Sequence, residues 1–261
     1  MTVTWEEPRW DDLGWERLAA GVGRRRLPVW DCTVGLVVGA GGALLVDAGS
    51  SLREGSALRL EARKLAGRRV DLLALTHAHF DHVFGAAVFA GAHVVAAEGV
   101  GDEFGQVGRE ALCADAVRNG LDAGAAEEAA DTLVVPHELL STSRTLSLAL
   151  PLAPLTPAPG TADGPGEVHL VNAGPGHTRG DLVAVVPGEP TVVFCGDLVE
   201  ESGEPQAGPD AVPSHWPAAL DRLLALGGED ALYVPGHGAV VDAAFVRAQR
   251  DALASRFGVS R

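Results

Sequence analysis

The stretch Thr76-His77-Ala78-His79-Phe80-Asp81-His82, THAHFDH, places three imidazoles and one carboxylate within six residues, from His77 to His82. It follows the apolar run VDLLAL (residues 70–75), which is typical of a strand buried on both faces. Several polar side chains at the end of a buried strand cost free energy unless they bind a partner. The H-x-H-x-D-H pattern therefore predicts a metal site at the end of this strand.

Residues of the same chemical kind follow other apolar runs. Asp47 ends LLVDAG, His177 lies in GPGHT, Asp197 ends VVFCGD and His237 lies in PGHG. Neutral imidazole suits zinc and iron, and a carboxylate can bridge two ions. One zinc takes about four ligands, but the chain offers seven candidates: His77, His79, Asp81, His82, His177, Asp197 and His237. The set predicts two ions that share a bridging group and activate water.

The remaining histidines lack such settings, and we expect structural roles for His93, His137, His169 and His215. His215 is placed between Asp197 and His237 in the sequence and could also reach the rim of a cleft. Arg179, two residues after His177, could meet an acidic group of a substrate. Arg179 and His215 are thus the predicted substrate-binding residues.

The order of strand-like and helix-like segments indicates the architecture. The segments 32–39 and 43–49 predict a hairpin around a Gly-rich turn, and residues 54–65 predict a helix. Further strands follow in the second half, before a helix that begins near Pro217. This mixture predicts a single domain, residues 1–261, of two mixed sheets packed together with helices outside.

Two segments stand apart from this pattern. Trp5, Trp10 and Trp15 recur at a spacing that fits neither a helix face nor a strand face, so residues 1–25 are predicted to form an N-terminal arm. The arm would pack onto the body or onto a neighbouring subunit, as in a homodimer. Residues 101–145 are predicted to contain a helical lid insertion, which would lie over the metals together with the loop 200–216.

Composition narrows the class of protein. The net charge of −15 repels phosphate backbones, so nucleic acid is not an expected partner, and the run Arg24-Arg25-Arg26 reads as a solvated turn. No apolar run approaches the roughly 18 residues of a membrane helix, and the acidic start lacks a secretory pattern. The three cysteines are few and widely spaced. We therefore expect a cytoplasmic protein with a small-molecule substrate.

In order and spacing, these motifs resemble the metallo-β-lactamase superfamily over roughly residues 36–240. The resemblance rests on five motifs together: Asp47, then His77/His79/Asp81/His82, then His177, Asp197 and His237. It implies an α+β fold, a four-layer αβ/βα sandwich of two mixed β-sheets flanked by helices, with the metals at one edge of the sheets.

The resemblance also implies a role for each residue. His77, His79 and His177 would hold one zinc, whereas Asp81, His82 and His237 would hold the second. Asp197 would bridge the two ions, and Asp47 would order the metal loop through hydrogen bonds. Two Zn²⁺ per chain are implied, with iron or manganese as alternatives. A metal-bound hydroxide would be the nucleophile, with Asp81 as the catalytic residue that orients it.

The motifs give less information about which group of relatives within the superfamily this chain resembles. Flavodiiron-type relatives usually carry a glutamate where His79 stands, and lactonase relatives tend to carry a tyrosine shortly after the bridging aspartate, where Leu198-Val199-Glu200 stands here. The predicted function is a zinc hydrolase of an activated carbonyl, such as a thioester, lactone or similar ester. The alternatives are an iron-dependent redox or persulfide-type metalloprotein and a lactam-cleaving enzyme.

Overall fold

A computed structural model describes residues 9–149 and 164–259 of the chain, so Trp5 of the predicted arm lies outside the described residues. Within these two ranges, twelve strands form two mixed sheets in the order β1-β2-β3-β4-β5-β6-β7 and β12-β11-β10-β9-β8. The first sheet comprises β1 (Glu16–Ala19), β2 (Val22–Arg26), β3 (Thr33–Val38), β4 (Ala43–Val46), β5 (Leu72–Ala74), β6 (His93–Ala97) and β7 (Glu138–Leu140). The second comprises β8 (Ser143–Ser147), β9 (Glu167–Asn172), β10 (Leu182–Val186), β11 (Val192–Glu200) and β12 (Leu232–His237).

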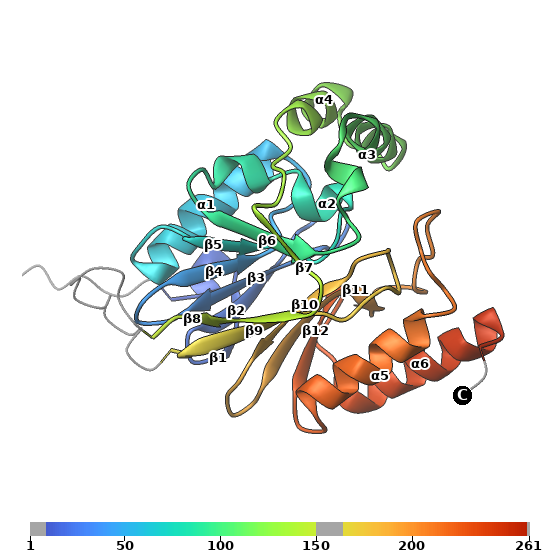
Figure 1. The fold of residues 1–261 in the computed structure, drawn as a ribbon. Helices are drawn as coiled ribbons and strands as arrows, with labels where there is room; N and C mark the ends of the chain where they lie inside the picture. The colour runs from blue at the N-terminus through green and yellow to red at the C-terminus, as the bar shows by residue number, and fades with distance from the viewer. Residues whose placement is uncertain (1–8, 150–163, 260–261) are drawn as a thin grey trace, which may run out of the picture.

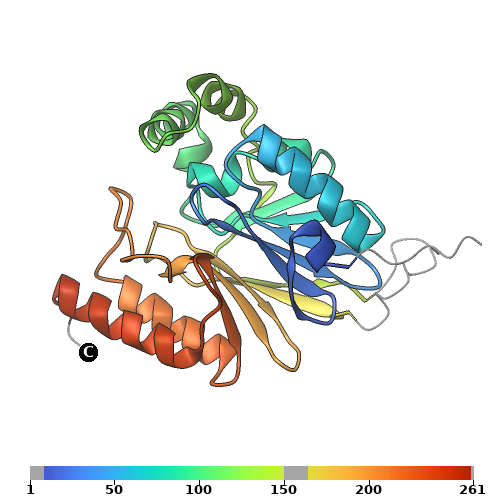
Figure 2. The same ribbon diagram turned by 180° about the vertical axis from the view of Figure 1, so that it is seen from behind.

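Helices cover the outer faces of both sheets (Figures 1 and 2). The helices that follow strands of the first sheet are α1 (Leu52–Ala66), α2 (Phe80–Val83), α3 (Gln106–Arg118) and α4 (Ala123–Asp131), and those that cover the second are α5 (Trp216–Gly227) and α6 (Ala243–Phe257). Single 3-10 turns lie at η1 (Asp11–Leu13), η2 (Ala86–Val88) and η3 (Asp102–Phe104). Ser51 and Asp242 cap α1 and α6 by accepting hydrogen bonds from backbone N–H groups of the first turn.

Three apolar cores of described residues lie between the layers of the sandwich. One joins the first sheet to its helices and includes Leu45 and Leu58, and a second lies between the sheets and includes Leu44 and Phe194. The third joins the second sheet to α5 and α6. Leu44 and Leu45 are neighbours in β4 yet belong to different cores, because successive side chains of a strand point to opposite faces. These cores confirm the predicted four-layer αβ/βα sandwich.

The predicted N-terminal arm needs correction for the residues that the structure describes. From Glu16 the chain forms β1 and β2 of the first sheet, and the Trp15 ring is fully buried, with its Nε1 donating to Glu61. The predicted solvated turn at Arg24 is also wrong, since Arg24 lies in β2 with 3% of its surface exposed. The spacing of the tryptophans did not show these strands because the sheet begins only after Trp15.

The predicted insertion at residues 101–145 is helical in its first part. It contains η3, α3 and α4, which stand at one end of the molecule beyond α2 (Figure 1). Its last part instead pairs into both sheets, through β7 with β6 and through β8 with β9. The segment therefore joins the two halves of the sandwich as well as supplying helices near the strand ends.

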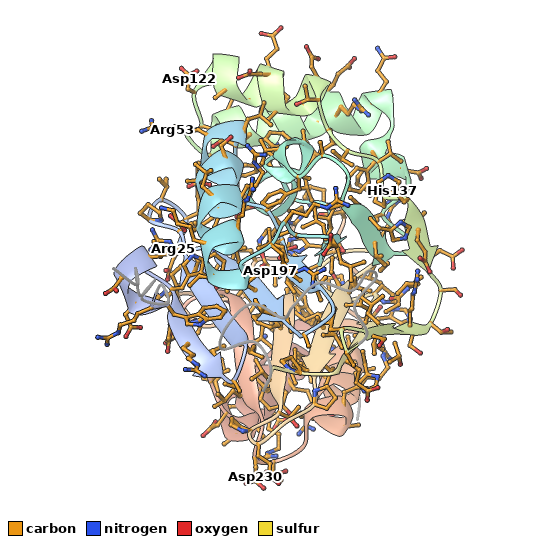
Figure 3. All side chains as sticks on the ribbon, turned by 90° about the vertical axis from the view of Figure 1, so that its left-hand side faces the viewer. Arg25, Arg53, Asp122, His137, Asp197 and Asp230 are labelled. Atoms are coloured by element: carbon orange, nitrogen blue, oxygen red, sulfur yellow. The ribbon has the colours of Figure 1, made fainter. Side chains whose placement is uncertain are left out.

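The topology gathers the predicted motifs at one edge of the sandwich. Strands β4 and β5 are parallel, and so are β11 and β12, so in each pair the carboxyl ends point the same way. Asp47 follows β4, the segment His77–His82 follows β5, and His237 ends β12. Asp197 lies within β11 and is seen between the two halves of the sandwich in Figure 3. Within the described ranges, none of the helices is long and apolar enough to cross a membrane.

The contact between the sheets gives a test of the packing. A methyl group at Gly35 of β3 would lie 2.5 Å from the ring of Phe194 in β11. Substituting Gly35→Ala should lower the free energy of unfolding by about 1–3 kcal/mol, because an overpacked core must shift. Gly203→Ala is the control, since a methyl group there meets nothing within 4 Å. Equal unfolding midpoints of the two variants in urea would contradict this packing.

Candidate metal centre

Asp47 holds the start of the histidine-rich segment in place. Its backbone adopts a left-handed conformation with φ of 63°. Its Oδ1 accepts from the backbone N–H of Thr76 at 2.8 Å, and its Oδ2 accepts from the Thr76 hydroxyl at 2.8 Å. Oδ2 also lies 2.9 Å from Nδ1 of His82. Asp47 therefore fixes both the turn after β5 and the orientation of one imidazole.

A first group of predicted ligands comes from both halves of the chain. One ligand atom from each of His77, His79, His177 and Asp197 lies within 4.8 Å of the others. Nδ1 of His79 is 3.0 Å from Nε2 of His177. Asp197 Oδ2 lies 3.6 Å from His77 Nε2 and 3.5 Å from His177 Nε2. Three imidazoles and one carboxylate thus converge on one small volume, which suits a single tetrahedral cation.

A second group adjoins the first and shares Asp197. His82, Asp197 and His237 also bring ligand atoms within 4.8 Å of one another. Nε2 of His82 is 3.2 Å from Asp197 Oδ1, and Nε2 of His237 is 3.3 Å from Asp197 Oδ2. Asp81 Oδ2 lies 3.3 Å from the same nitrogen of His237. Asp81 therefore stands beside this second group, and Asp197 belongs to both.

Two buried polar atoms in the centre have no hydrogen-bond partner: Nε2 of His77 and Oδ1 of Asp197. Native structures contain few such orphaned atoms, and each calls for an explanation such as an ion. An imidazole nitrogen and a carboxylate oxygen are the kinds of ligand atom that zinc takes. The donor set therefore fits a metal at this position.

Each predicted imidazole ligand is oriented by a contact to its other nitrogen. The partners are Thr76 Oγ1 for His77, Asp210 for His79, Asp47 for His82, the Gln206 carbonyl for His177 and the Trp30 carbonyl for His237, at 2.7–3.0 Å. Such contacts fix the ring orientation and raise the basicity of a metal ligand. The other ring nitrogen of each imidazole, which is the candidate ligand atom, is thereby held in a fixed direction.

Burial and charge divide the imidazoles of the metal-free chain into two sets. Burial, and then the neighbouring His82, lowers the pKa of His77 well below its usual value, and burial lowers the pKa of His177 to about 4. Burial also favours the neutral forms of His79, His82 and His237, but nearby acidic groups outweigh it. They raise the pKa of all three, that of His237 to about 12.

A cleft of about 410 Å³ opens above the two groups. Predicted ligands form its floor, while Trp30 and Phe80 line one part and the loop 202–208 lines another. Asp115 and Asn119, at the end of α3, complete the lining near Trp30. The end of α3 and the loop therefore lie at the cleft, whereas α4 does not line it.

The predicted substrate-binding residues lie elsewhere. Arg179 is exposed, its backbone packs against Gly99, and its side chain is not among those that line the cleft. His215 is also exposed, with Nδ1 3.2 Å from the Ser214 hydroxyl, and it does not line the cleft either. The position of these residues in the sequence, after His177 or between Asp197 and His237, therefore did not predict where their side chains lie.

Several residues at the centre escaped the sequence analysis. Asp210 and the carbonyls of Trp30 and Gln206 act through loops whose course no local pattern reveals. Arg24 donates from Nη1 to the Gly238 carbonyl at 2.8 Å and so supports the loop of His237. Glu200 lines the cleft, and the signal for it was its place three residues after Asp197.

Cys32 is another neighbour of the second group. Its Sγ lies 3.7 Å from both ring nitrogens of His82 and 3.3 Å from the Asp81 carbonyl. One ligand atom from each of Cys32, Asp81 and His82 lies within 4.8 Å of the others. Burial raises the pKa of the Cys32 thiol to about 11, so it packs as a neutral group.

The sandwich fold and the shared-carboxylate cluster define a metal-binding class of αβ/βα proteins. A family model described as the metallo-beta-lactamase superfamily matches residues 27–237. The chain belongs to this superfamily, whose members are mostly metal-dependent hydrolases. Comparison with curated proteins gave no significant match.

Solved structures agree with the family assignment. A metallo-β-lactamase from Pontibacter korlensis has a TM-score of 0.63 and 21% identity, over 92% of this chain and 97% of that one. The metallo-β-lactamase FIM-1 from Pseudomonas aeruginosa, in a mono-zinc form, has a TM-score of 0.64 and 20% identity, over 94% and 96%. DIM-1 metallo-β-lactamase has a TM-score of 0.65 and 17% identity, over 93% and 97%. At these identities the likeness shows the fold alone.

Asp47 offers a test of the orienting contacts. In Asp47→Asn an amide N–H₂ group must face either Thr76 or Nδ1 of His82, so one of the present contacts is lost. We expect zinc affinity to fall by about 10–100-fold, as for other partners of ligand imidazoles. Competition with a chromophoric chelator measures the affinity, and Asp221→Asn, an exposed acid paired with Arg250, is the control. Retention of the parent affinity in Asp47→Asn would remove Asp47 from this role.

The raised pKa values of His79, His82 and His237 make a second prediction. The raised pKa values favour the protonated forms of these imidazoles in the metal-free chain, and a protonated imidazole must lose a proton to bind a cation, so zinc uptake should release protons. His77 and His177, with lowered pKa values, are already neutral and release none. Zinc affinity should therefore fall as the pH falls. Calorimetric titration of zinc in buffers of different ionisation enthalpy measures the release, and a value of zero at pH 7 would contradict the assignment.

Proposed function

We propose that the protein is a dinuclear zinc hydrolase of an activated carbonyl, such as a thioester, lactone or similar ester. The observation that carries the proposal is the shared position of Asp197. Its Oδ2 lies between His177 of one group and His237 of the other, and its Oδ1 lies beside His82. A carboxylate between two such groups suits two cations better than one. Membership of a superfamily of mostly metal-dependent hydrolases supports the same reading.

Each predicted ligand would have a defined role in such a site. His77, His79 and His177 would hold one zinc, Asp81, His82 and His237 would hold the other, and Asp197 would bridge. Bound zinc lowers the pKa of water and stabilises negative charge on the oxygen of an attacked carbonyl.

Asp81 is the candidate catalytic carboxylate. It lines the cleft, and its Oδ2 lies 3.3 Å from Nε2 of His237 and 3.8 Å from Nε2 of His82. Both imidazoles hold its pKa below the usual value against the effect of burial, so it remains an anion. An anionic carboxylate at the floor of the cleft can accept a hydrogen bond from the attacking water and orient it.

A small-molecule substrate suits the cleft of about 410 Å³. The cytoplasmic location, the absence of nucleic-acid and membrane partners and a homodimer remain predictions from the sequence. Iron-dependent redox chemistry is the competing proposal, because imidazole and carboxylate also bind iron. Lactam cleavage is the other, since the similar solved structures carry metallo-β-lactamase names.

His79→Ala tests the proposed function. We expect zinc content to fall from two ions per chain and turnover of a thioester and lactone panel to drop by more than about 100-fold, since even outer partners of ligands change affinity 10–100-fold. Metal analysis and a thiol-release assay measure the two quantities. His169→Ala is the matched control, because His169 contacts Thr145 and Glu167 away from the cleft.

The outcomes separate the candidates. Zinc-loaded protein that cleaves no thioester or lactone speaks against the proposed activity. Oxygen consumption that depends on iron would favour the redox alternative, and cleavage of a lactam alone would favour the third.

A further inference from the structure

Apart from the predicted ligands, the ionisable side chains that line the cleft are all acidic. These acidic side chains are those of Asp115, Glu200 and Glu204, and no lysine or arginine is among the described residues of its wall. The arginine that the sequence offered for an acidic substrate, Arg179, lies outside the cleft. An anionic part of a substrate would thus find no cation beyond the metal positions themselves.

An aromatic wall stands beside one of these acids. The rings of Trp30 and Phe80 meet edge to face with centroids 5.2 Å apart, and both line the cleft. Trp30 donates from Nε1 to the Asn119 carbonyl at 3.2 Å, and the Asn119 amide donates to the Asp115 carbonyl at 3.0 Å. These contacts hold the last turn of α3 beside Trp30, and Asp115, one helical turn before Asn119, lines the same cleft as the two rings.

The arginines that pair with Asp115 and Glu204 do not offset these two acids within the cleft. Asp115 pairs with Arg118 at 2.9 Å and Glu204 with Arg256 at 3.3 Å, but neither arginine lines the cleft. Both pairs are exposed, with 68% of Arg118 and 74% of Glu204 accessible, so water screens them and they bind weakly. Burial raises the pKa of Glu200 to about 8, so this side chain adds little negative charge near neutral pH; it accepts a hydrogen bond from Gln206 N–H at 2.8 Å.

Acids beside aromatic faces form a good environment for a substituted ammonium group, which is attracted both to the carboxylates and to the ring faces. On the basis of the proposed hydrolase activity, we propose that the cleft selects acyl substrates that carry a cationic amine beyond the scissile carbonyl. It discriminates against substrates with a carboxylate or phosphate at that place. Asp115 and Glu204 are the specificity-determining residues.

A matched series of thioesters tests the proposal. One acyl group is joined to 2-(dimethylamino)ethanethiol, 2-mercaptoethanol or 3-mercaptopropionate, so the leaving group is cationic, neutral or anionic. Values of kcat/KM are divided by the rates of alkaline hydrolysis to remove differences in leaving-group reactivity. We expect the order cation, neutral, anion, with a ratio of about tenfold or more between the extremes at low salt. The ratio should shrink between about 0.01 M and 1 M salt, as the Debye length falls from about 30 Å to 3 Å.

The variant Asp115→Asn with Glu204→Gln should lower that ratio several-fold. Its matched control is Asp221→Asn with Glu229→Gln, which removes two exposed acids that also pair with arginines but do not line the cleft. The control changes the net charge by the same amount and should leave the ratio as it is. An anion preferred over the cation, or an equal fall of the ratio in both double variants, would overturn the proposal.

Binding of the three free thiols to the zinc-loaded protein gives a readout that needs no turnover. Calorimetry should rank their Kd values in the same order, and the Asp115/Glu204 double variant should compress the range. If none of the thioesters is cleaved, the proposed hydrolase activity fails, while the order of thiol affinities still decides the charge selectivity. Tightest binding by 3-mercaptopropionate would refute the selectivity even if thioesters are cleaved.

Discussion

The buried carboxylate of Asp197 constrains the whole edge of the sandwich. Burial disfavours its charge, yet His237, His82 and His77 hold its pKa well below the usual value, so it stays ionised among imidazoles. A buried anion is tolerated only when opposite charge and hydrogen bonds surround it. Those partners come from the segment after β5 and from the end of β12, and His177, 3.5 Å from Asp197, comes from the loop between β9 and β10. The two sheets must therefore pack in one fixed relation for Asp197 to be stable.

Glycines allow this close approach. Gly196 precedes Asp197 with φ of 54°, and a methyl group there would meet Thr76, the residue that Asp47 holds. A methyl group at Gly236, beside His237, would collide with the Asp197 carboxylate itself. The backbone positions on either side of the shared carboxylate thus leave no room for a larger side chain, and the apolar core between the sheets sets the distance across which the ligands meet.

Local patterns predicted what is local in this molecule. The hairpin of β3 and β4, the helix α1 and the end of β5 follow from apolar periodicity and turn residues, and the cluster His77–His82 carries its chemistry in consecutive positions. Residues 16–26 were misread because short strands with arginines lack a clear alternation, and Arg24 is buried only through its partners Glu16 and Gly238. Arg179, which was predicted at the cleft but does not line it, and Asp210, which was not predicted but contacts His79, show the same limit of local patterns. Whether a loop side chain faces a cleft depends on tertiary contacts that neighbours in sequence do not encode.

Backbone carbonyls orient two of the five imidazoles, His177 and His237. For these two ligands, the contact that orients the ring does not depend on the side chains that shape the cleft. The Trp30 carbonyl contacts His237 while the Trp30 ring lines the cleft, and the Gln206 carbonyl contacts His177 within a loop that also lines it. A substitution of either side chain would leave its carbonyl in place as long as the backbone keeps its course. The lining can therefore change its charge and aromatic character without moving the imidazoles. Asp210 differs from these two carbonyls, because it orients His79 through its side chain and ties that ligand to the course of the loop.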